Sequence, residues 1–186
     1  MKILSPHPAL SLKGRGIIRK IVLIGFMGTG KTKVGKALAK HLSWKFLDSD
    51  SIIEKKEGRR ISTIFKVEGE AYFRDVESRV IRDVSRLKNV VISAGGGAVL
   101  RRENMERLKK GGIIVCLNAK PMTILRRLKG DRSRPLLKRK NKLNNVRRLL
   151  RLRMPYYRDA ADHIIHTDGL TVCQITWKVL EAIHVP

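Results

Sequence analysis

The residues best suited to chemistry lie in the stretch Gly25 to Thr32, which reads GFMGTGKT and fits the pattern G-x-x-x-x-G-K-[ST]. Such a loop binds phosphate, because its glycines let backbone N–H groups point inward and the following helix adds a partial positive charge. Lys31 is expected to reach the β- and γ-phosphates of a nucleotide, and the Thr32 hydroxyl to be a ligand of Mg²⁺. The sequence therefore predicts a nucleotide site, in preference to a Gly-rich turn that only joins a strand to a helix.

Two further groups of residues follow apolar runs that are typical of strands. Asp48 and Asp50 come after residues 44–47, and three glycines, residues 95–97, come after residues 90–93. The carboxyl ends of strands in an open α/β sheet present ligand-binding groups, so both carboxylates are expected beside the phosphate loop. One Asp simply capping the next helix is the alternative. Three glycines favour close approach of a small molecule to the backbone, since a tight turn normally needs only one.

Arg74 and Glu77 lie three residues apart in a segment with helical spacing of apolar residues. Arg74 is able to bind a substrate carboxylate through two parallel hydrogen bonds. The alternative is a surface pair with Glu77, worth about 0.2–0.5 kcal/mol. The helical pattern alone does not decide between the two.

Strands and helices alternate along the chain, which predicts a single α/β domain with a mostly parallel, five-stranded sheet covered on both faces. The expected strands are residues 21–24, 44–47, 90–93, 113–117 and 164–165. The expected helices are residues 31–41, 51–58, 62–67, 69–87, 102–110, one opened by Pro121, 143–159 with a bend at Pro155, and a last one capped by Thr171-x-x-Gln174 and ending near residue 183.

Two segments break the apolar pattern. Residues 129–141 carry Gly130, Pro135 and many basic side chains, which is typical of a lid and makes Arg127, Arg132 and Arg134 candidates for phosphate or adenine contacts. Residues 1–19 have no sustained periodicity and are predicted to be a flexible basic extension outside a domain of residues 20–186. The composition of this extension fits an organelle transit peptide poorly.

The net charge of +25 is the abnormal feature of the composition. Residues 101–153 hold 19 Lys or Arg against three acids. Such a field attracts nucleotides and, without specificity, nucleic acid, but few aromatic side chains interleave with the basic ones to stack on bases. The two cysteines, Cys116 and Cys173, indicate neither a disulfide framework nor a zinc site. The longest apolar runs are too short to span a bilayer, so a cytoplasmic protein is expected.

Six stretches in this order resemble the shikimate kinase family, small P-loop kinases of the pathway to chorismate and the aromatic amino acids. They are GFMGTGKT at 25–32, FLDSD at 46–50, GEAYFRDVE at 69–77, SAGGGAV at 93–99, RPLL at 134–137 and RMPYYRDAAD at 153–162. The resemblance covers residues 20–185. It implies a P-loop kinase fold with a lid and a helical substrate-binding segment, and ATP-dependent phosphorylation of the 3-hydroxyl of shikimate.

The resemblance also implies roles for individual residues. Arg74 and Arg153 would bind the carboxylate of shikimate and Asp50 its ring hydroxyls, with catalysis assigned to Lys31, Asp50 and Arg134. Asp48 would help Thr32 to hold Mg²⁺, while Arg134 would contact the transferring phosphate and Arg127 the adenine. The implied acceptor-site residues are Asp50, Arg74, Glu77, Gly95, Gly96, Gly97 and Arg153. The implied ATP-binding residues are Gly28, Thr29, Gly30, Lys31, Thr32, Lys33, Arg127 and Arg134.

Two other functions compete with this interpretation. A kinase with another acceptor, such as gluconate, shares the phosphate machinery, because a fold alone does not fix a substrate. An RNA- or ribosome-associated module would use the basic face instead. Asp50, Arg74 and the glycines at 95–97 argue against the gluconate kinase, because they call for an acceptor with both hydroxyls and a carboxylate. We expect no specific nucleic-acid partner. The protein is expected to be a monomer. The basic extension and the Lys- and Arg-rich lid depart from the family pattern without touching a motif residue.

Overall fold

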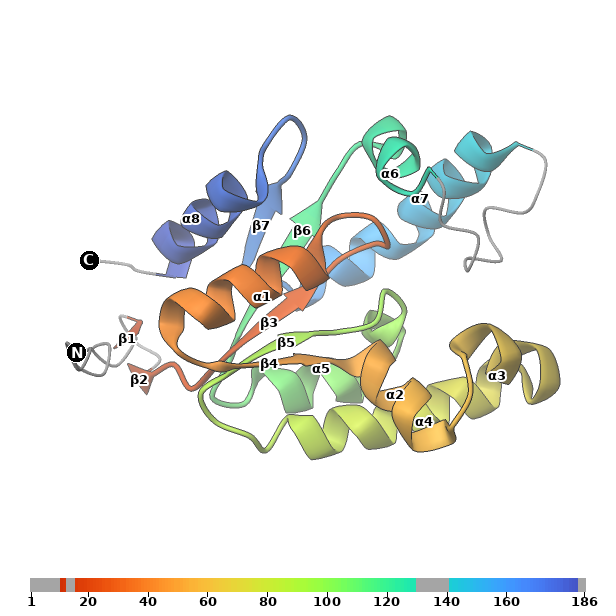
Figure 1. Ribbon diagram of the computed structural model, residues 1–186, viewed down its shortest axis with the longest axis horizontal. Helices are drawn as coiled ribbons and strands as arrows, with labels where there is room; N and C mark the ends of the chain where they lie inside the picture. The colour runs from red at the N-terminus through yellow and green to blue at the C-terminus, as the bar shows by residue number, and fades with distance from the viewer. Residues whose placement is uncertain (1–10, 13–15, 130–140, 184–186) are drawn as a thin grey trace.

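The computed structural model describes residues 11–12, 16–129 and 141–183, and at its centre is a five-stranded parallel sheet (Figure 1). The strands are β3 (Lys20–Ile24), β4 (Lys45–Asp48), β5 (Val90–Ser93), β6 (Ile113–Asn118) and β7 (His163–His166). They lie in the order β4-β5-β3-β6-β7, and every neighbouring pair is parallel. The predicted fold class is confirmed, and the five strands lie within a residue or two of their expected positions.

The helices form a layer on each face of the sheet (Figure 1). One layer consists of α1 (Lys31–Leu42) and α8 (Val172–Ile183). The other contains α4 (Gly69–Val84), α5 (Arg102–Lys109) and α7 (Lys142–Ala160), with the turn η1 (Ala98–Leu100). At the ends of this arrangement lie α2 (Ser49–Glu57), α3 (Ile61–Val67) and α6 (Pro121–Arg127).

The central strand β3 explains why both layers are needed. All five of its residues are buried, as expected for a strand with helices on both sides. Ile21 and Leu23 pack with α1 and α8, while Val22 and Ile24 pack with the α4, α5 and α7 side, because successive side chains of a strand point to opposite faces. The phosphate loop follows this rigid strand directly.

Two helix ends differ by two or more residues from the sequence predictions, and the other predicted ends lie within one residue. The helix expected to open at Ser51 begins at Ser49, and its N-cap is Asp48, whose carboxylate accepts from the backbone N of Asp50 at 3.1 Å. The Asp48 carboxylate caps the N–H of Asp50 in the first turn, so the helix starts two residues earlier. Helix α4 ends at Val84 rather than residue 87. The predicted cap of α8 is confirmed, since Thr171 and Gln174 exchange hydrogen bonds at 2.9 and 3.3 Å.

The predicted extension and lid are described only in part. Strands β1 (Ser11–Leu12) and β2 (Gly16–Ile17) pair antiparallel, and Ile18 is buried in the core beside β3. Most of the predicted lid, residues 130–140, lies outside the described residues, and so do Arg132 and Arg134. Among the described residues, no helix combines the length and apolar character that crossing a membrane requires.

Candidate functional site

The phosphate loop joins the end of β3 to the start of α1 in a conformation that glycine permits. Gly30, the N-cap of α1, has φ +104°, a region that L side chains rarely adopt. The Lys31 ammonium donates to the carbonyls of Gly25 at 2.7 Å and Phe26 at 3.1 Å. The Thr29 hydroxyl is buried and donates to Phe26 O at 2.8 Å. The loop is thus braced from within, with the N-terminus of a twelve-residue helix behind it.

Thr32 and Asp48 provide neighbouring oxygen atoms beside this loop. The Thr32 hydroxyl donates to Asp48 Oδ2 at 2.9 Å, and Asp48 Oδ1 accepts from the Asp50 backbone. Asp48 therefore caps α2 with one oxygen and faces Thr32 with the other. No cluster of three His, Cys, Asp or Glu occurs among the described residues. A hydroxyl and a carboxylate fit Mg²⁺, which keeps waters and binds substrate phosphates rather than sitting in a cage made of protein alone.

Asp50 and Glu77 meet at the first glycine of the turn after β5. A Cβ atom built on Gly95 would lie 2.6 Å from both Asp50 Oδ1 and Glu77 Oε1, so any side chain at this position would fill the space between the carboxylates. The backbone N of Gly95 donates to the Ser49 hydroxyl at 2.9 Å, and Ser49 is fully buried. The FLDSD segment and the glycine turn are therefore held together, as the strand-end argument predicts.

Arg74 faces the same turn, and both ends of its guanidinium are bound. Its Nη1 donates to Glu77 Oε2 at 2.6 Å, and its Nη2 donates to Glu70 Oε1 at 3.0 Å. A Cβ atom built on Gly97 would collide with this guanidinium. The Arg74 side chain is only 11% exposed and that of Glu77 only 1%, so the pair does not lie free on the surface.

The surroundings of Glu77 shift the pKa of its carboxyl upward. Burial raises the pKa of its carboxyl, the neighbouring Asp50 acts in the same direction, and Arg74 opposes both. Its Oε1 is buried and has no hydrogen-bond partner among the described residues. Burial also disfavours the charged Arg74, but the two glutamates outweigh this and raise its pKa. An unpartnered buried oxygen beside an arginine is typical of a site that a polar ligand completes.

Helix α7 closes the site from the other side. Arg153 Nη1 donates to Gly96 O at 3.3 Å, and the guanidinium carbon lies 5.8 Å from the centre of the Phe26 ring. The Tyr157 hydroxyl donates to the same Gly96 carbonyl at 2.6 Å. No role of its own is predicted for Tyr157 from the sequence. The signals for it there are its place one helical turn after Arg153 and its place in the RMPYYRDAAD stretch.

Arg127, the last residue of α6, lies against the phosphate loop. Its Nη1 donates to the Thr167 hydroxyl at 2.8 Å and to Thr29 O at 3.3 Å, and its Nη2 donates to Thr167 O at 2.6 Å. Thr167 is fully buried and its hydroxyl donates to Asn118 O at 3.1 Å. Sequence reasoning missed Thr167. Lys33 is exposed in the first turn of α1.

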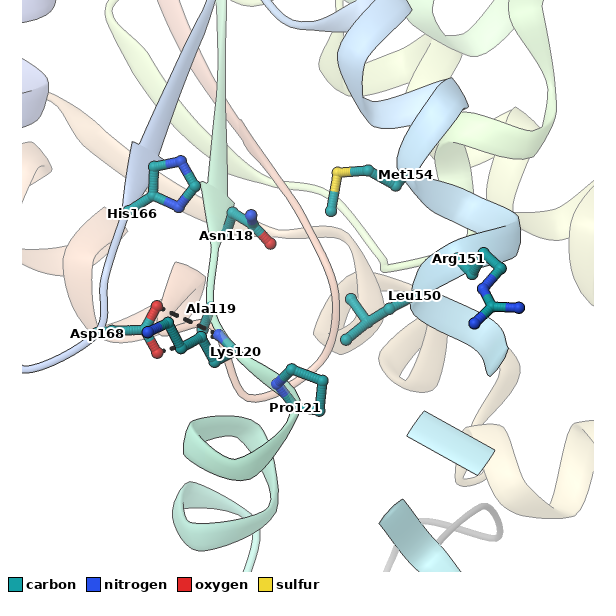
Figure 2. Close-up of a pocket in the computed structure, with 9 residues that line it drawn as sticks. All are labelled: Asn118, Ala119, Lys120, Pro121, Leu150, Arg151, Met154, His166 and Asp168. Atoms are coloured by element: carbon teal, nitrogen blue, oxygen red, sulfur yellow. Dashed lines mark hydrogen bonds between the residues drawn. The ribbon is translucent and has the colours of Figure 1, made fainter. Parts of the chain in front are cut away.

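A cavity of about 380 Å³ lies between α7 and the ends of β6 and β7, beside Asn118, whose carbonyl binds Thr167 (Figure 2). Leu150 and Met154 face it from α7, and Asn118, Lys120 and Asp168 lie on its other side. The Asp168 carboxylate accepts from the backbone N of Lys120 at 3.0 and 3.2 Å. None of the predicted acceptor-site residues is among the described residues that line it. These residues, called the acceptor cluster below, therefore lie outside the cavity; they are Asp50, Arg74, Glu77, Gly95, Gly96, Gly97 and Arg153.

The phosphate loop and the acid and guanidinium groups lie together at the carboxyl edge of the sheet, an arrangement that defines a P-loop kinase with an adjacent acceptor site. A family model described as shikimate kinase matches residues 27–184. The chain belongs to the shikimate kinase family, and the resemblance seen in the sequence is confirmed.

Individual relatives agree with the family model. The shikimate kinase of Thermodesulfovibrio yellowstonii is 49% identical over 88% of this chain and 94% of its own length. The shikimate kinase of Caldicellulosiruptor bescii is 51% identical over 83% of this chain and 89% of its own length. The solved structure of the Acinetobacter baumannii shikimate kinase, in complex with shikimate, is 40% identical, with a TM-score of 0.86 over 89% of this chain and 93% of that one. The likeness thus extends over nearly the whole domain.

Proposed function

We propose that this chain transfers the γ-phosphoryl group of ATP to the 3-hydroxyl of shikimate, giving shikimate 3-phosphate and ADP in the route to chorismate and the aromatic amino acids. One observation carries the proposal. A Cβ atom built on Gly96 would lie 3.5 Å from Gly25 O and 3.7 Å from Met27 N, so the glycine turn of the acceptor cluster lies against the phosphate loop. A donor phosphate and an acceptor held by these two loops are neighbours, as transfer requires.

The acceptor that the cluster suits carries both a carboxylate and hydroxyl groups. Arg74 and Arg153 supply guanidinium groups on either side of the glycine turn, and a guanidinium matches a carboxylate in shape and charge. Asp50 and Glu77 Oε1, which has no hydrogen-bond partner in the part of the chain that the structure describes, supply acceptors for hydroxyl protons. Shikimate carries both kinds of group.

The chemistry needs alignment of the two substrates and positive charge near the transferring group. Lys31 supplies one charge within the phosphate loop, and Arg134 is assigned the second by the family resemblance. Asp50 orients the hydroxyl and is able to take its proton. Exclusion of water, a competing acceptor, is assigned to the predicted lid of residues 129–141.

Mg²⁺ would be held by Thr32, with Asp48 fixing the Thr32 hydroxyl through their 2.9 Å contact. The ion supplies neutralisation of the β- and γ-phosphate charge. Arg127 is proposed to pack on the adenine, and its three bonds to Thr167 and Thr29 hold it beside the phosphate loop. Gly28, Gly30 and the neighbouring loop residues would contact the phosphates through their backbone N–H groups.

We further propose that the enzyme acts as a cytoplasmic monomer without a specific nucleic-acid partner. The excess of basic side chains supports only salt-labile attraction of polyanions. Of the predicted extension of residues 1–19, residues 1–10 are proposed to contribute little to catalysis. Removing residues 1–10 tests this last point without disturbing Ile18, which packs in the core.

The test of the central proposal is a panel of hydroxy acids and sugars in a coupled assay of ADP release, with the product identified by phosphorus NMR. Shikimate is expected to be the preferred acceptor, with phosphate on its 3-oxygen. The Lys31→Met variant serves as a control, because a contaminating kinase would be unaffected by it. Faster turnover of gluconate than of shikimate would overturn the proposal.

A further inference from the structure

The Gly96 carbonyl is a meeting point of two donors from one helix. The Tyr157 hydroxyl donates to it at 2.6 Å and Arg153 Nη1 at 3.3 Å. The two side chains are four residues apart on α7 and so lie one above the other on the same face. A single backbone oxygen therefore ties α7 to the glycine turn.

The hydrogen bond from the Tyr157 hydroxyl is the shorter of the two, and Tyr157 is shielded from solvent. The residue is 1% exposed, and burial raises the pKa of its hydroxyl, so it keeps its proton and donates at any ordinary pH. The aromatic ring packs in the core under the sheet, where phenylalanine would fill nearly the same volume. Packing therefore accounts for the ring, and the hydroxyl requires a separate explanation.

The rest of the glycine turn is fixed as well. The Gly95 N–H donates to the buried Ser49 hydroxyl, and a Cβ atom built on Gly96 would lie 3.5 Å from Gly25 O of the phosphate loop. Ser49 thus fixes the Gly95 N–H at the start of the turn, and Tyr157 fixes the Gly96 carbonyl that follows it. Rotation of the Gly96 peptide would change the spacing among Arg153, the acceptor carboxylates and the phosphate loop.

We propose that Tyr157 is a positioning residue of the acceptor site. Its hydroxyl acts through the Gly96 peptide, which it fixes so that Arg153 on α7 and the glycine turn after β5 keep one relative geometry. The identity of the acceptor rests on the proposed function above. The contacts of Tyr157 and Arg153 with Gly96 O do not depend on which acid binds at this site.

The Tyr157→Phe variant removes the hydroxyl and keeps the ring. We expect about a fivefold to tenfold rise in KM for shikimate, the size of effect expected when one hydrogen bond is lost. The KM for ATP should stay within about twofold of wild type, because nothing in the nucleotide loop loses a bond. The matched control is Tyr156→Phe on the same helix, whose side chain is 50% exposed, and it should behave as wild type.

A second variant separates positioning from general stability. Arg153→Lys weakens the other bond to Gly96 O, so combining it with Tyr157→Phe should raise KM for shikimate by less than the product of the two single effects. Thermal unfolding of each variant, with and without shikimate or ATP, is measured first. Positioning predicts that shikimate stabilises Tyr157→Phe less than wild type, while ATP stabilises both alike.

Three results would overturn the inference: a Tyr157→Phe variant with wild-type KM for shikimate, equal loss of affinity for both substrates, or failure of the variant to fold. The last result would assign the hydroxyl to global stability. Failure of the proposed function gives a different pattern, in which wild type and Tyr156→Phe also do not phosphorylate shikimate. The two failures are therefore distinguishable.

Discussion

Thr32 and Asp48 are in hydrogen-bond contact, with 2.9 Å between Thr32 Oγ1 and Asp48 Oδ2, although 16 residues separate them along the chain. Thr32 lies in the first turn of α1 and Asp48 at the end of β4. The contact joins the phosphate loop to the segment that carries Asp50. It also places a carboxylate behind the hydroxyl to which the family resemblance assigns Mg²⁺.

The Asp48→Asn variant should need more Mg²⁺. Asn keeps the shape and the ability to cap α2, so stability should change little, but the carboxylate charge near the metal is lost. Loss of such a supporting group typically costs about 10-fold to 100-fold in metal affinity. The measurement is the phosphorylation rate against Mg²⁺ concentration at saturating substrates. An unchanged half-saturating Mg²⁺ concentration would remove Asp48 from the metal site.

Arg74→Lys should weaken shikimate binding by about tenfold or more, because an ammonium cannot replace a planar guanidinium that is bound at both ends. ATP binding should be unaffected. Calorimetric titration of each ligand measures both effects, and Arg102→Lys, whose side chain is 91% exposed and pairs with Glu106, is the control. Equal weakening of both ligands by Arg74→Lys would indicate a purely structural arginine.

Glu77 should give the acceptor site a pH dependence. Burial, and to a smaller extent the nearby Asp50, raise the pKa of this carboxyl above its ordinary value of 4.5. The carboxyl therefore takes up its proton at a higher pH than a free glutamate does. As the pH falls through the raised pKa, the pair with Arg74 is lost and the Kd for shikimate should rise. Glu77→Gln should bind shikimate more weakly at neutral pH and lack this rise.

The raised pKa of Glu77 also makes the free energy of unfolding depend on pH. The folded state holds the Glu77 proton more tightly than the unfolded chain does, so this group lowers the free energy of unfolding as the pH rises from 4.5 to the raised pKa. Urea unfolding of wild type and Glu77→Gln across this window measures the difference. A Gln variant that retains the wild-type pH profiles of both binding and unfolding would contradict the assignment.

Thr167→Val should impair the nucleotide site alone. Valine keeps the branched shape but removes the hydroxyl that accepts from Arg127 and donates to Asn118 O. We expect a rise of about threefold to tenfold in KM for ATP, the size of one lost hydrogen bond, with KM for shikimate unchanged. Thr176→Val is the control, since that buried hydroxyl donates to Val172 O within α8. A larger effect on shikimate than on ATP would refute this role for Thr167.

Much of the fold follows from the sequence because its signals are local. Runs such as residues 90–93 and 113–117 are buried strands, and the pattern G-x-x-x-x-G-K-T is a strand–loop–helix unit. Asp48 and Asp50 could be placed beside it because parallel strands end at one edge. The family motifs then supplied roles that spacing alone leaves open, as for Arg74.

Residues that act through distant backbone atoms were missed. Ser49 accepts from Gly95 N, Tyr157 donates to Gly96 O and Thr167 donates to Asn118 O, over separations of 46, 61 and 49 residues. A serine, tyrosine or threonine in a helix or loop does not reveal which peptide group it faces. Only the packing of the layers brings these partners together. The start of α2 was missed for a related reason, since either Asp48 or Ser51 was able to cap it.

The most direct test is the rate of shikimate phosphorylation by Asp50→Asn, measured at saturating ATP over a range of Mg²⁺ concentrations. Asn keeps the size of the side chain but loses the charge that orients the hydroxyl and takes its proton. Removing such a base typically lowers the rate by about 10² to 10⁴. We expect a loss of that order with ATP affinity nearly intact and no rescue by added Mg²⁺. Turnover close to the wild-type rate, or rescue by Mg²⁺, would contradict the placement of the acceptor at Asp50.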